Sequence, residues 1–527
     1  MGDLVKPSVF KDFDVLIVGA GLAGLSTAYF LRDLSDYKIA VATKVSDGYG
    51  SSTFYSQGAF RCPGSSYGRE SYVKDTLEGG RHINRRYLVE LLASECRDSI
   101  LSLERAGIRF AETRTGLQVV SDDVLFPGRE IVTKLSHYLL GRGVEFLEWS
   151  SLIDIARLEN GGYLALFTSR NSLVSVGAKA VVLATGGAAN AYSRSDNPSQ
   201  LACEGHGLAL RLGLPLVDME FVQFHPLGIA EPGRPSIMAP PFRNGKLVNK
   251  LGEDIIVKYG LESLGKAYVL YRDALSRAMM LEVREGRGVD GALLLYPEVS
   301  EEESRAVNAV KRLGLPIPMR VMPVAHYTMG GVEVGKDLRT ELPGLYVVGE
   351  LIGGVHGANR LGGNALTACV TFSKLVAADL LNYVRKEFDR GGVAEPRNIE
   401  EITDMYSSGE GGPDPADIRS RIRELMWSKV GVLRDGDGLE EAVETLYQVL
   451  DTLRTVKIGN VRDLTKLREA ESTALTSLAI ATSALRRKES RGAHYRLDYP
   501  EESNSWLLSI KTRMRDGKLI ISEEPLT

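Results

Sequence analysis

Short apolar runs separated by long stretches of mixed polarity give the first part of the chain the pattern of an α/β protein. Residues 14–18, DVLIV, are typical of a buried parallel strand. Apolar positions then follow at helical spacing over 25–33, so we expect a strand, a tight turn and a helix. Similar apolar runs recur at 38–44, 180–187 and 344–350. The pattern predicts one sheet whose strands come from distant parts of the chain.

The last third of the chain has a different pattern. Apolar residues recur every three or four positions over 418–433, 439–456 and 465–491, which predicts amphipathic helices. The segment before them, 385–415, is rich in glycine, proline and acidic residues and is typical of a linker. Packing against the rest of the chain is the simplest role for these helices, although their outer faces are also suited to a partner subunit.

Composition narrows the class of protein. The chain has 527 residues, 44% hydrophobic and 25% charged, which suits two or three globular domains. A net charge of −4 does not favour nucleic acid as a partner. The four cysteines form no C-x-x-C pair, so we expect no metal centre, neither an iron–sulfur cluster nor a zinc site, and their scatter suits a cytoplasmic protein. Without a signal-peptide core or an 18-residue apolar run, we expect no direct membrane insertion.

The turn after the first strand has the spacing of a dinucleotide-binding loop. Gly19, Gly21 and Gly24 form G-x-G-x-x-G between the predicted strand and helix. Gly19 permits the tight turn, Gly21 lets the backbone approach a pyrophosphate, and Gly24 lets the helix pack on the strand. The next strand ends in Thr43-Lys44 instead of an acidic residue, which argues against a plain NAD site. Together with the runs at 180–187 and 344–350, the turn predicts an FAD domain.

Several longer motifs resemble one family of flavoproteins. They are GAGLAG, SSTFYSQG (51–58), MEFVQFHP (219–226), YRDALSRA (271–278), HYTMGG (326–331), HGANRLGGNAL (356–366) and RKESRGAHYRLDYP (487–500). In these motifs the chain resembles the flavoprotein subunits of succinate dehydrogenase and fumarate reductase, with L-aspartate oxidase as a close relative. The resemblance implies an FAD-binding Rossmann-like domain, interrupted by an α+β capping domain and followed by a helical domain and a tail.

On this resemblance we divide the chain into six segments. They are 1–225 and 323–385 for the FAD domain, 226–322 for the capping domain, 386–416 for the linker, 417–490 for the helical domain and 491–527 for the tail.

The resemblance also implies how FAD is held. Beyond the three glycines, the cofactor contacts that we expect are Thr43, Lys44, Ser51, Ser52, Thr53, Gln57, Gly58, Ala184, Thr185, Gly186, Glu350, Asn364 and Leu366. Ser52 stands where succinate dehydrogenases carry the histidine that bonds to the flavin, so we expect FAD to be noncovalent. His206 stands in a GHG triplet where relatives have G-D-G near the cofactor, which leaves its role open between packing and cofactor contact.

The expected substrate is a C4 dicarboxylate. By resemblance, His225, His326 and Arg360 hold its carboxylates, and Arg272 is the proton donor; a guanidinium can bind a carboxylate through two hydrogen bonds. The family's T-E-x-x-R motif corresponds here to Ala239-Pro240 with Arg243 retained. The glutamate that reprotonates the arginine is therefore missing, and Glu231 or Glu253 is a candidate to replace it.

Three functions remain open. The first is fumarate–succinate interconversion with an iron–sulfur partner, which could hold the chain at the cytoplasmic face of a membrane. The second is L-aspartate oxidation to iminoaspartate, which STFYSQG favours, although no glutamate in 113–131 clearly matches the one that recognises the substrate amine. The third is a flavin-binding subunit whose catalytic role is lost or changed, which the Ala239-Pro240 replacement motivates.

Overall fold

A seven-stranded sheet forms the centre of the computed structural model, which describes residues 9–46, 48–123, 125–159, 161–240, 242, 244–298, 304–386, 388 and 412–526. The strand order is β6-β2-β1-β9-β8-β7, and β16 also pairs with β9. The strands are β1 (Val9–Val18), β2 (Ile39–Ala42), β6 (Glu145–Leu147), β7 (Ser150–Arg157), β8 (Tyr163–Ser169), β9 (Ser172–Leu183) and β16 (Leu345–Val347).

The parallel part of this sheet joins the distant apolar runs of the sequence. β1 pairs in parallel with β2 and β9, and β16 pairs in parallel with β9. Ile17 therefore lies between Val41 and Val182, and Val347 lies beside Leu183. β7, β8 and β9 pair in antiparallel fashion. The predicted α/β fold, with one sheet built from remote segments, is confirmed.

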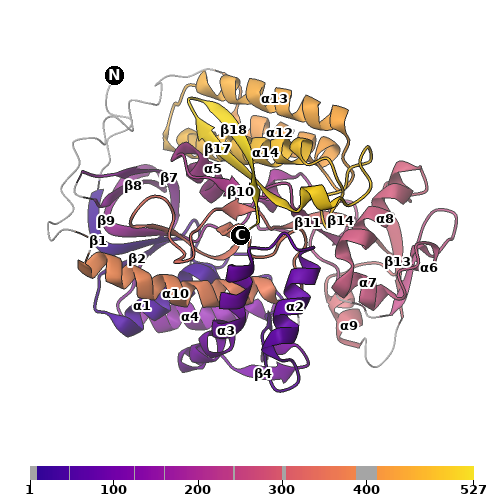
Figure 1. The fold of residues 1–527 in the computed structure, drawn as a ribbon, viewed down its shortest axis with the longest axis horizontal. Coiled ribbons are helices and arrows are strands. Elements are labelled where there is room, and N and C mark those ends of the chain that lie inside the picture. Colours follow the sequence, from indigo (N-terminus) through magenta and orange to yellow (C-terminus); the bar gives the residue numbers. More distant parts are fainter. Residues whose placement is uncertain are drawn as a thin grey trace.

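Helices cover one face of this sheet (Figure 1). α1 (Leu22–Leu34) packs against α4 (Gly128–Leu140) and α10 (Asn364–Lys386), and α10 packs against α3 (Arg86–Ser102). α10 is long and apolar enough to cross a membrane by length and composition, but 61% of that apolar stretch is buried inside the protein. Such burial is what the packing of a core helix produces.

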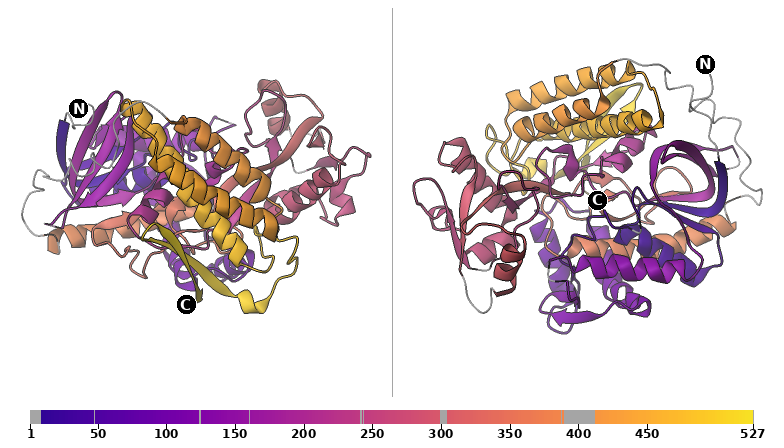
Figure 2. Two further views of the ribbon diagram at one scale, coloured as in Figure 1. Left: turned by 90° about the horizontal axis from the view of Figure 1, so that it is seen from above. Right: turned by 180° about the vertical axis from the view of Figure 1, so that it is seen from behind.

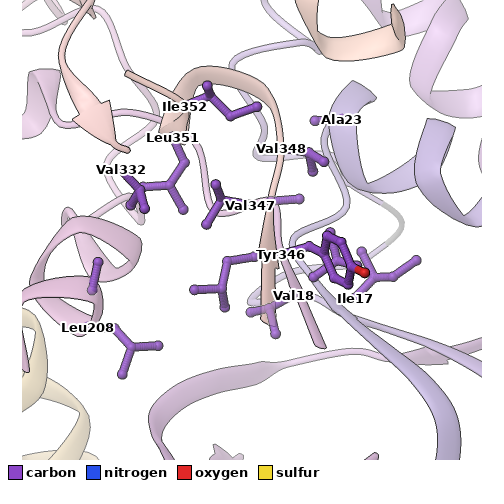
Figure 3. Packing of buried hydrophobic residues seen from close by; sticks show 14 of the residues in the cluster. Ile17, Val18, Ala23, Leu208, Val332, Tyr346, Val347, Val348, Leu351 and Ile352 are labelled. Atoms are coloured by element: carbon purple, nitrogen blue, oxygen red, sulfur yellow. The ribbon is translucent and has the colours of Figure 1, made fainter. Parts of the chain in front are cut away.

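The core continues from the sheet to the segments behind it. Val18 of β1, Ala23 of α1 and Val347 of β16 lie close to Leu208 and Leu351 from later segments (Figure 3). All five are buried. Because these residues come from three distant parts of the sequence, around 18–23, 208 and 347–351, the core ties the ends of β1 and β16 to α5 (Glu204–Arg211).

A second sheet stands apart from the first and has its own core. Its order is β11-β14-β13-β12, and all of its pairs are antiparallel. Its strands are β11 (Val222–Ile229), β12 (Gly245–Val248), β13 (Leu293–Pro297) and β14 (Met319–Thr328), and the helices around it are α6 (Ile255–Lys258), α7 (Leu264–Leu270), α8 (Arg272–Arg284) and α9 (Ser304–Arg312). β11 and β14 connect this unit to the rest, while the boundaries at 225 and 322 stay a prediction.

Three helices and a hairpin complete the fold, and the helices run side by side (Figure 2). Asp414, Asp435 and Asn460 cap the helices by accepting backbone N–H groups of their first turns. The helices are α12 (Pro415–Lys429), α13 (Gly436–Arg454) and α14 (Val461–Arg486). Their apolar faces join the main core, so the predicted amphipathic pattern reflects packing. The expected linker 386–416 lies almost wholly outside the described residues.

The hairpin of β17 (Leu508–Arg515) and β18 (Lys518–Pro525) extends a third sheet, in the order β15-β10-β17-β18. The chain after α14 therefore returns to the FAD-domain segments, where β17 pairs with β10. The other strands and α-helices of the described residues are β3 (Ala59–Arg61), β4 (Phe110–Thr113), β5 (Gly116–Val119), β10 (Leu216–Val217), β15 (Gly331–Val332) and α2 (Arg69–Gly79).

Candidate active site

The glycine turn between β1 and α1 is built for close contact. Gly19 has φ +115°, and a Cβ there would lie 2.2 Å from the carbonyl oxygen of Ala184. A Cβ on Gly24 would lie 1.9 Å from the carbonyl oxygen of Gly19. Gly21 is the residue before the first turn of α1, where the Leu22 N–H donates to Thr53 Oγ1 at 3.0 Å. The turn therefore brings backbone and a hydroxyl to the N-terminus of a helix, where an anion binds well.

The segment after this turn supplies polar groups from the predicted SSTFYSQG motif. Ser51 and Thr53 lie within 3.6 Å of a Cβ placed on Gly21. Ser52 Oγ is buried and has no hydrogen-bond partner among the described residues. Gln57 Nε2 donates to Leu125 O at 3.3 Å, and Gly58 has φ +66°. A buried hydroxyl without a partner carries a desolvation cost, which a bound polar group would remove.

The end of β2 leads to Thr43 and Lys44. The Thr43 N–H donates to Leu147 O at 3.0 Å. Lys44 forms ion pairs with Glu204 and Glu469 and donates to a backbone oxygen. Burial works to lower the pKa of Lys44, but the two carboxylates outweigh it and the pKa rises. Lys44 is therefore held as a cation, already engaged by protein groups.

A cavity of about 540 Å³ opens beside Lys44. The described residues that form its wall include four cations and no carboxylate. The lining residues are Lys44, Trp149, Ser151, Thr168, Arg170, Arg462, Thr465 and Lys466. No sequence pattern indicated this cavity, because its wall combines the end of β2, two strands and α14.

The ATG turn meets Glu350, which lies three residues beyond the end of β16, since a Cβ on Gly187 would lie 1.9 Å from Glu350 Oε1. Ala184 N donates to Val18 O at 2.8 Å, Gly186 has φ +80°, and Thr185 Oγ1 is buried without a partner among the described residues. Glu350 Oε1 accepts from Thr328 N at 2.9 Å, and burial raises the pKa of Glu350 to about 7. These groups lie against the glycine turn, since a Cβ on Gly19 would clash with Ala184.

Of three further candidate residues, Asn364 and Leu366 have protein contacts, while both ring nitrogens of His206 are buried without a hydrogen-bond partner among the described residues. Asn364 begins α10, accepts from Tyr72 Oη at 3.1 Å and donates to Thr76 Oγ1 at 3.3 Å. Leu366 packs against the main core. His206 is fully buried, and burial lowers its pKa to about 4. His206 is therefore a neutral side chain inside α5.

Two histidines face one another across β11 and β14. The ring centroids of His225 and His326 lie 5.4 Å apart. Both ring nitrogens of His225 are buried without a partner in the described part of the chain. Burial, together with Arg272, His326 and Arg360, holds the pKa of His225 well below its usual range. His225 is a neutral imidazole surrounded by positive charge.

Arg360 reaches the same place from the loop before α10. It is 6% exposed, its Nη2 donates to Gln223 Oε1 at 3.0 Å, and its Cζ lies 4.4 Å from the ring centre of Tyr327. Its Nε is buried and has no partner among the residues that the structure describes. Burial, with nearby Arg272 next in size, lowers the pKa of Arg360 to about 10. A buried guanidinium with a free N–H is suited to an anionic ligand.

Arg272 begins α8 and completes the cluster. Its Nε donates to Tyr268 O at 3.0 Å, and its Cζ lies 5.4 Å from the ring centre of Tyr268. The same ring lies 5.1 Å from that of His225. Arg272 Nη2 is 3.7 Å from the Cβ position of Gly362, in the loop that carries Arg360. The structure thus brings His225, His326, Arg272 and Arg360 together.

The candidate replacements for the family's proton relay have other partners. Ala239 is buried, and its N–H donates to Leu227 O at 2.7 Å, so it packs in the second core. Glu231 pairs with Arg320, and Glu253 pairs with Lys258 at 2.7 Å, so both glutamates are engaged elsewhere. Arg243 lies outside the described residues.

Sequence reasoning missed several contributors to the site. Gln223 positions Arg360, Tyr268 lies between His225 and Arg272, and Asp196 Oδ2 lies 2.8 Å from His326 Nδ1. Gln223 belongs to the MEFVQFHP motif, so the motif offered a signal for it. Asp196 and Tyr268 lie in segments with no recognisable pattern.

Comparison with known proteins places the chain in a family. A family model for an FAD-binding domain matches residues 14–366, and a model for the C-terminal part of fumarate reductase flavoproteins matches 419–527. This chain belongs to the succinate dehydrogenase and fumarate reductase flavoprotein family. As in other members of that family, the cofactor is FAD. The close-packed glycine turn at 19–24 fits such a nucleotide, and so do the buried hydroxyls of Ser52 and Thr185, which have no partner among the described residues.

The relatives of this flavoprotein are similar over nearly their whole length. An uncharacterised FAD-dependent oxidoreductase from Methanocaldococcus jannaschii is 33% identical over 94% of this chain and 95% of its own. One of the subunits of the fumarate reductase (CoM/CoB) from Methanothermobacter marburgensis is 31% identical over 95% and 97%. An L-aspartate oxidase from Saccharolobus solfataricus is 30% identical over 93% and 97%. The FrdA chain of E. coli quinol fumarate reductase superposes with a TM-score of 0.87, at 26% identity over 98% and 97%.

Proposed function

We propose that this flavoprotein interconverts fumarate and succinate. The observation that carries the proposal is the meeting of His225, His326, Arg272 and Arg360 from separate segments of the chain. Two guanidiniums and two imidazoles match the charge and hydrogen-bonding needs of a small diacid. The four side chains lie near Glu350 and the ATG turn, since Thr328, two residues beyond His326, donates its N–H to Glu350 and accepts from Ala188 N.

The roles of the side chains follow from their surroundings. Arg360, held by Gln223, offers its unpaired Nε to one carboxylate, and the buried histidines contact the substrate's carboxylates. When bound, FAD supplies the hydride for one carbon of the fumarate double bond through its reduced flavin ring. Arg272 delivers a proton to the other carbon through its Nη atoms, because its Nε is bound to Tyr268 O. Hydride and proton together convert fumarate to succinate.

Arg272 must recover its proton without the family's glutamate. Its side chain is half-buried, whereas Arg360 is almost fully buried. Exchange with water is therefore the route that we propose for its reprotonation, in place of Glu231 or Glu253.

The cofactor site extends from the glycine turn toward the end of β2. In the Rossmann arrangement the pyrophosphate lies at the first helix and the ribose near the end of the second strand. On that basis we assign Gly19, Gly21, Gly24, Ser51, Ser52 and Thr53 to the pyrophosphate and flavin half. The cationic cavity beside Lys44 is assigned to the adenosine half. Ser52 makes the attachment noncovalent, because a hydroxyl there cannot form the family's histidine–flavin bond.

Electron transfer needs a second protein. No C-x-x-C pair is present in the sequence, and relatives are named as subunits of larger enzymes. We therefore propose an iron–sulfur partner and a peripheral position on a membrane complex at its cytoplasmic face. The helices α12–α14 and the hairpin form a layer of their own that offers a surface for such a partner.

L-aspartate oxidase is the second candidate. The Ser-Thr-Phe-Tyr run at 52–55 and the 30% identity to one such enzyme favour it. One comparison separates the candidates: purified FAD-loaded protein is assayed with succinate, fumarate and L-aspartate side by side. Fumarate-dependent oxidation of reduced viologen supports the proposal. Flavin bleaching by L-aspartate alone would select the oxidase, and no reaction with FAD bound would select a subunit without catalysis.

A further inference from the structure

Asp196 and His326 form a fixed pair at the edge of the substrate cluster, by which we mean His225, His326, Arg272 and Arg360. Asp196 Oδ2 lies 2.8 Å from His326 Nδ1, and their side chains are 5% and 18% exposed. Asp196 N donates to Ala325 O at 3.2 Å. Asn197 Nδ2 donates both to Asp196 Oδ1, at 3.2 Å, and to His326 O, at 2.9 Å. Backbone and side-chain bonds thus hold the carboxylate against one nitrogen of the imidazole.

This contact determines how the imidazole meets a ligand. Because a carboxylate accepts, the proton of a neutral His326 sits on Nδ1 and faces Asp196. Nε2 then carries the lone pair of the ring. A lone pair repels a substrate carboxylate, whereas a protonated Nε2 donates to it.

The charges around His326 are mostly positive. The groups that face it are Arg272 from α8, Arg360 from the loop before α10, His225 from β11 and Asp196 from the segment before α5. Burial lowers the pKa of His326, Asp196 opposes this, and the two arginines add to the lowering. The free site therefore favours a neutral imidazole. A bound diacid brings two negative charges that offset the guanidiniums, so the same imidazole then favours its charged form.

We propose that Asp196 is a positioning residue that orients His326 and makes it take up one proton from solvent when a diacid binds. The proton goes to Nε2, no bond to the ligand forms, and the resulting imidazolium lies between Asp196 and a substrate carboxylate. The inference rests on the proposed function, because it needs a diacid in this cluster. It adds a residue outside the motifs that carry the family resemblance.

The test is titration calorimetry of malonate into oxidised, FAD-loaded protein, in buffers that differ in ionisation enthalpy. At about pH 7 we expect uptake of about one proton per malonate, and above that pH a Kd that rises about tenfold per unit. Asp196→Asn should weaken binding at least ~10-fold and remove most of the uptake, because an amide does not stabilise an imidazolium. Asp196→Glu should restore part of both.

Asp379→Asn is the matched control. It removes a part-buried carboxylate whose partners are Arg339 and Tyr346, and it should leave the uptake unchanged. If the parent protein does not bind malonate, the proposed function fails. Binding without uptake, or equal uptake in Asp196→Asn, overturns the inference and leaves the function standing. Should Asp196→Asn not fold, the parent protein and Asp196→Glu still decide between these results.

Discussion

The site consists of a few side chains whose burial is costly without a ligand. Arg360 is a nearly buried guanidinium beside a second arginine, and both ring nitrogens of His225 are unpartnered among the described residues. A diacid would neutralise the first and offer acceptors to the second. The positive charges of the neighbouring arginines lower the pKa of His225 and of Arg360, and the same charges favour binding of an anion. Substitutions of the arginines should therefore have large effects on activity.

Arg360→Ala should lower kcat/KM for fumarate at least ~100-fold while FAD remains bound. The change removes a carboxylate clamp and leaves Gln223 Oε1 without the guanidinium that donates to it. Steady-state kinetics and the flavin absorbance of the purified variant check both parts. Arg339→Ala, which removes an arginine that pairs with Asp379, is the matched control and should retain near-parental turnover. Near-parental turnover in Arg360→Ala would argue against a diacid clamp.

Arg272→Gln should keep malonate binding within ~10-fold of the parent and lower kcat at least ~1,000-fold. The glutamine keeps a polar side chain at the start of α8 but cannot deliver a proton as a guanidinium can. Calorimetry gives the affinity, and stopped-flow reoxidation of the reduced flavin by fumarate gives the rate. A variant that runs at the parental rate would remove Arg272 from the proton-transfer step.

Ser52 predicts how the cofactor leaves the protein. Acid precipitation should release FAD into the supernatant, because a serine in place of the histidine leaves no group at that position to form the covalent bond. The absorbance spectra of supernatant and pellet measure this directly. A pellet that stays yellow would show a covalent link through another residue.

At the scale of elements, the C-terminal hairpin is anchored through a buried carboxylate. Asp218 accepts from Ser509 Oγ at 2.7 Å and from Ile510 N at 3.0 Å. Burial, and next Glu220, raises the pKa of Asp218 to about 7. A carboxyl whose pKa is raised on folding contributes stability below its unfolded pKa, about 4, and loses it as pH rises through the folded pKa.

Asp218→Asn should therefore flatten the pH dependence of stability. Between about pH 4 and pH 7 the free energy of unfolding of the parent should fall relative to that of the variant, whose amide does not titrate. Denaturant unfolding at several pH values, followed by flavin fluorescence and circular dichroism, measures the difference. Parallel pH profiles for the two proteins would mean that Asp218 titrates normally.

Elements with a local signal are the ones that the sequence can predict. DVLIV with the glycine turn, and the periodic helices near the C-terminus, depend on neighbouring residues, and the structure has them. The caps Asp414, Asp435 and Asn460 begin each helix a few residues before the apolar pattern does. The hairpin β17–β18 has no such local signal, because its pairing with β10 joins residues almost 300 positions apart.

At the scale of the whole molecule, two units meet at the substrate cluster. β11 and β14 of the second sheet carry the two histidines. Arg360 comes from the loop before α10, a helix of the layer that covers the main sheet. Motifs predicted these residues one by one. The pair of Asp196 with His326 could not be predicted, because it depends on how segments 130 residues apart pack together.

The central claim is that a diacid bound by His225, His326, Arg272 and Arg360 reacts with the protein's own flavin. Anaerobic single-turnover mixing of the reduced holoprotein with fumarate tests it most directly. The account predicts that the oxidised flavin spectrum returns while succinate forms in an amount equal to the FAD present. A flavin that stays reduced with fumarate, in protein that carries its full FAD, would contradict it.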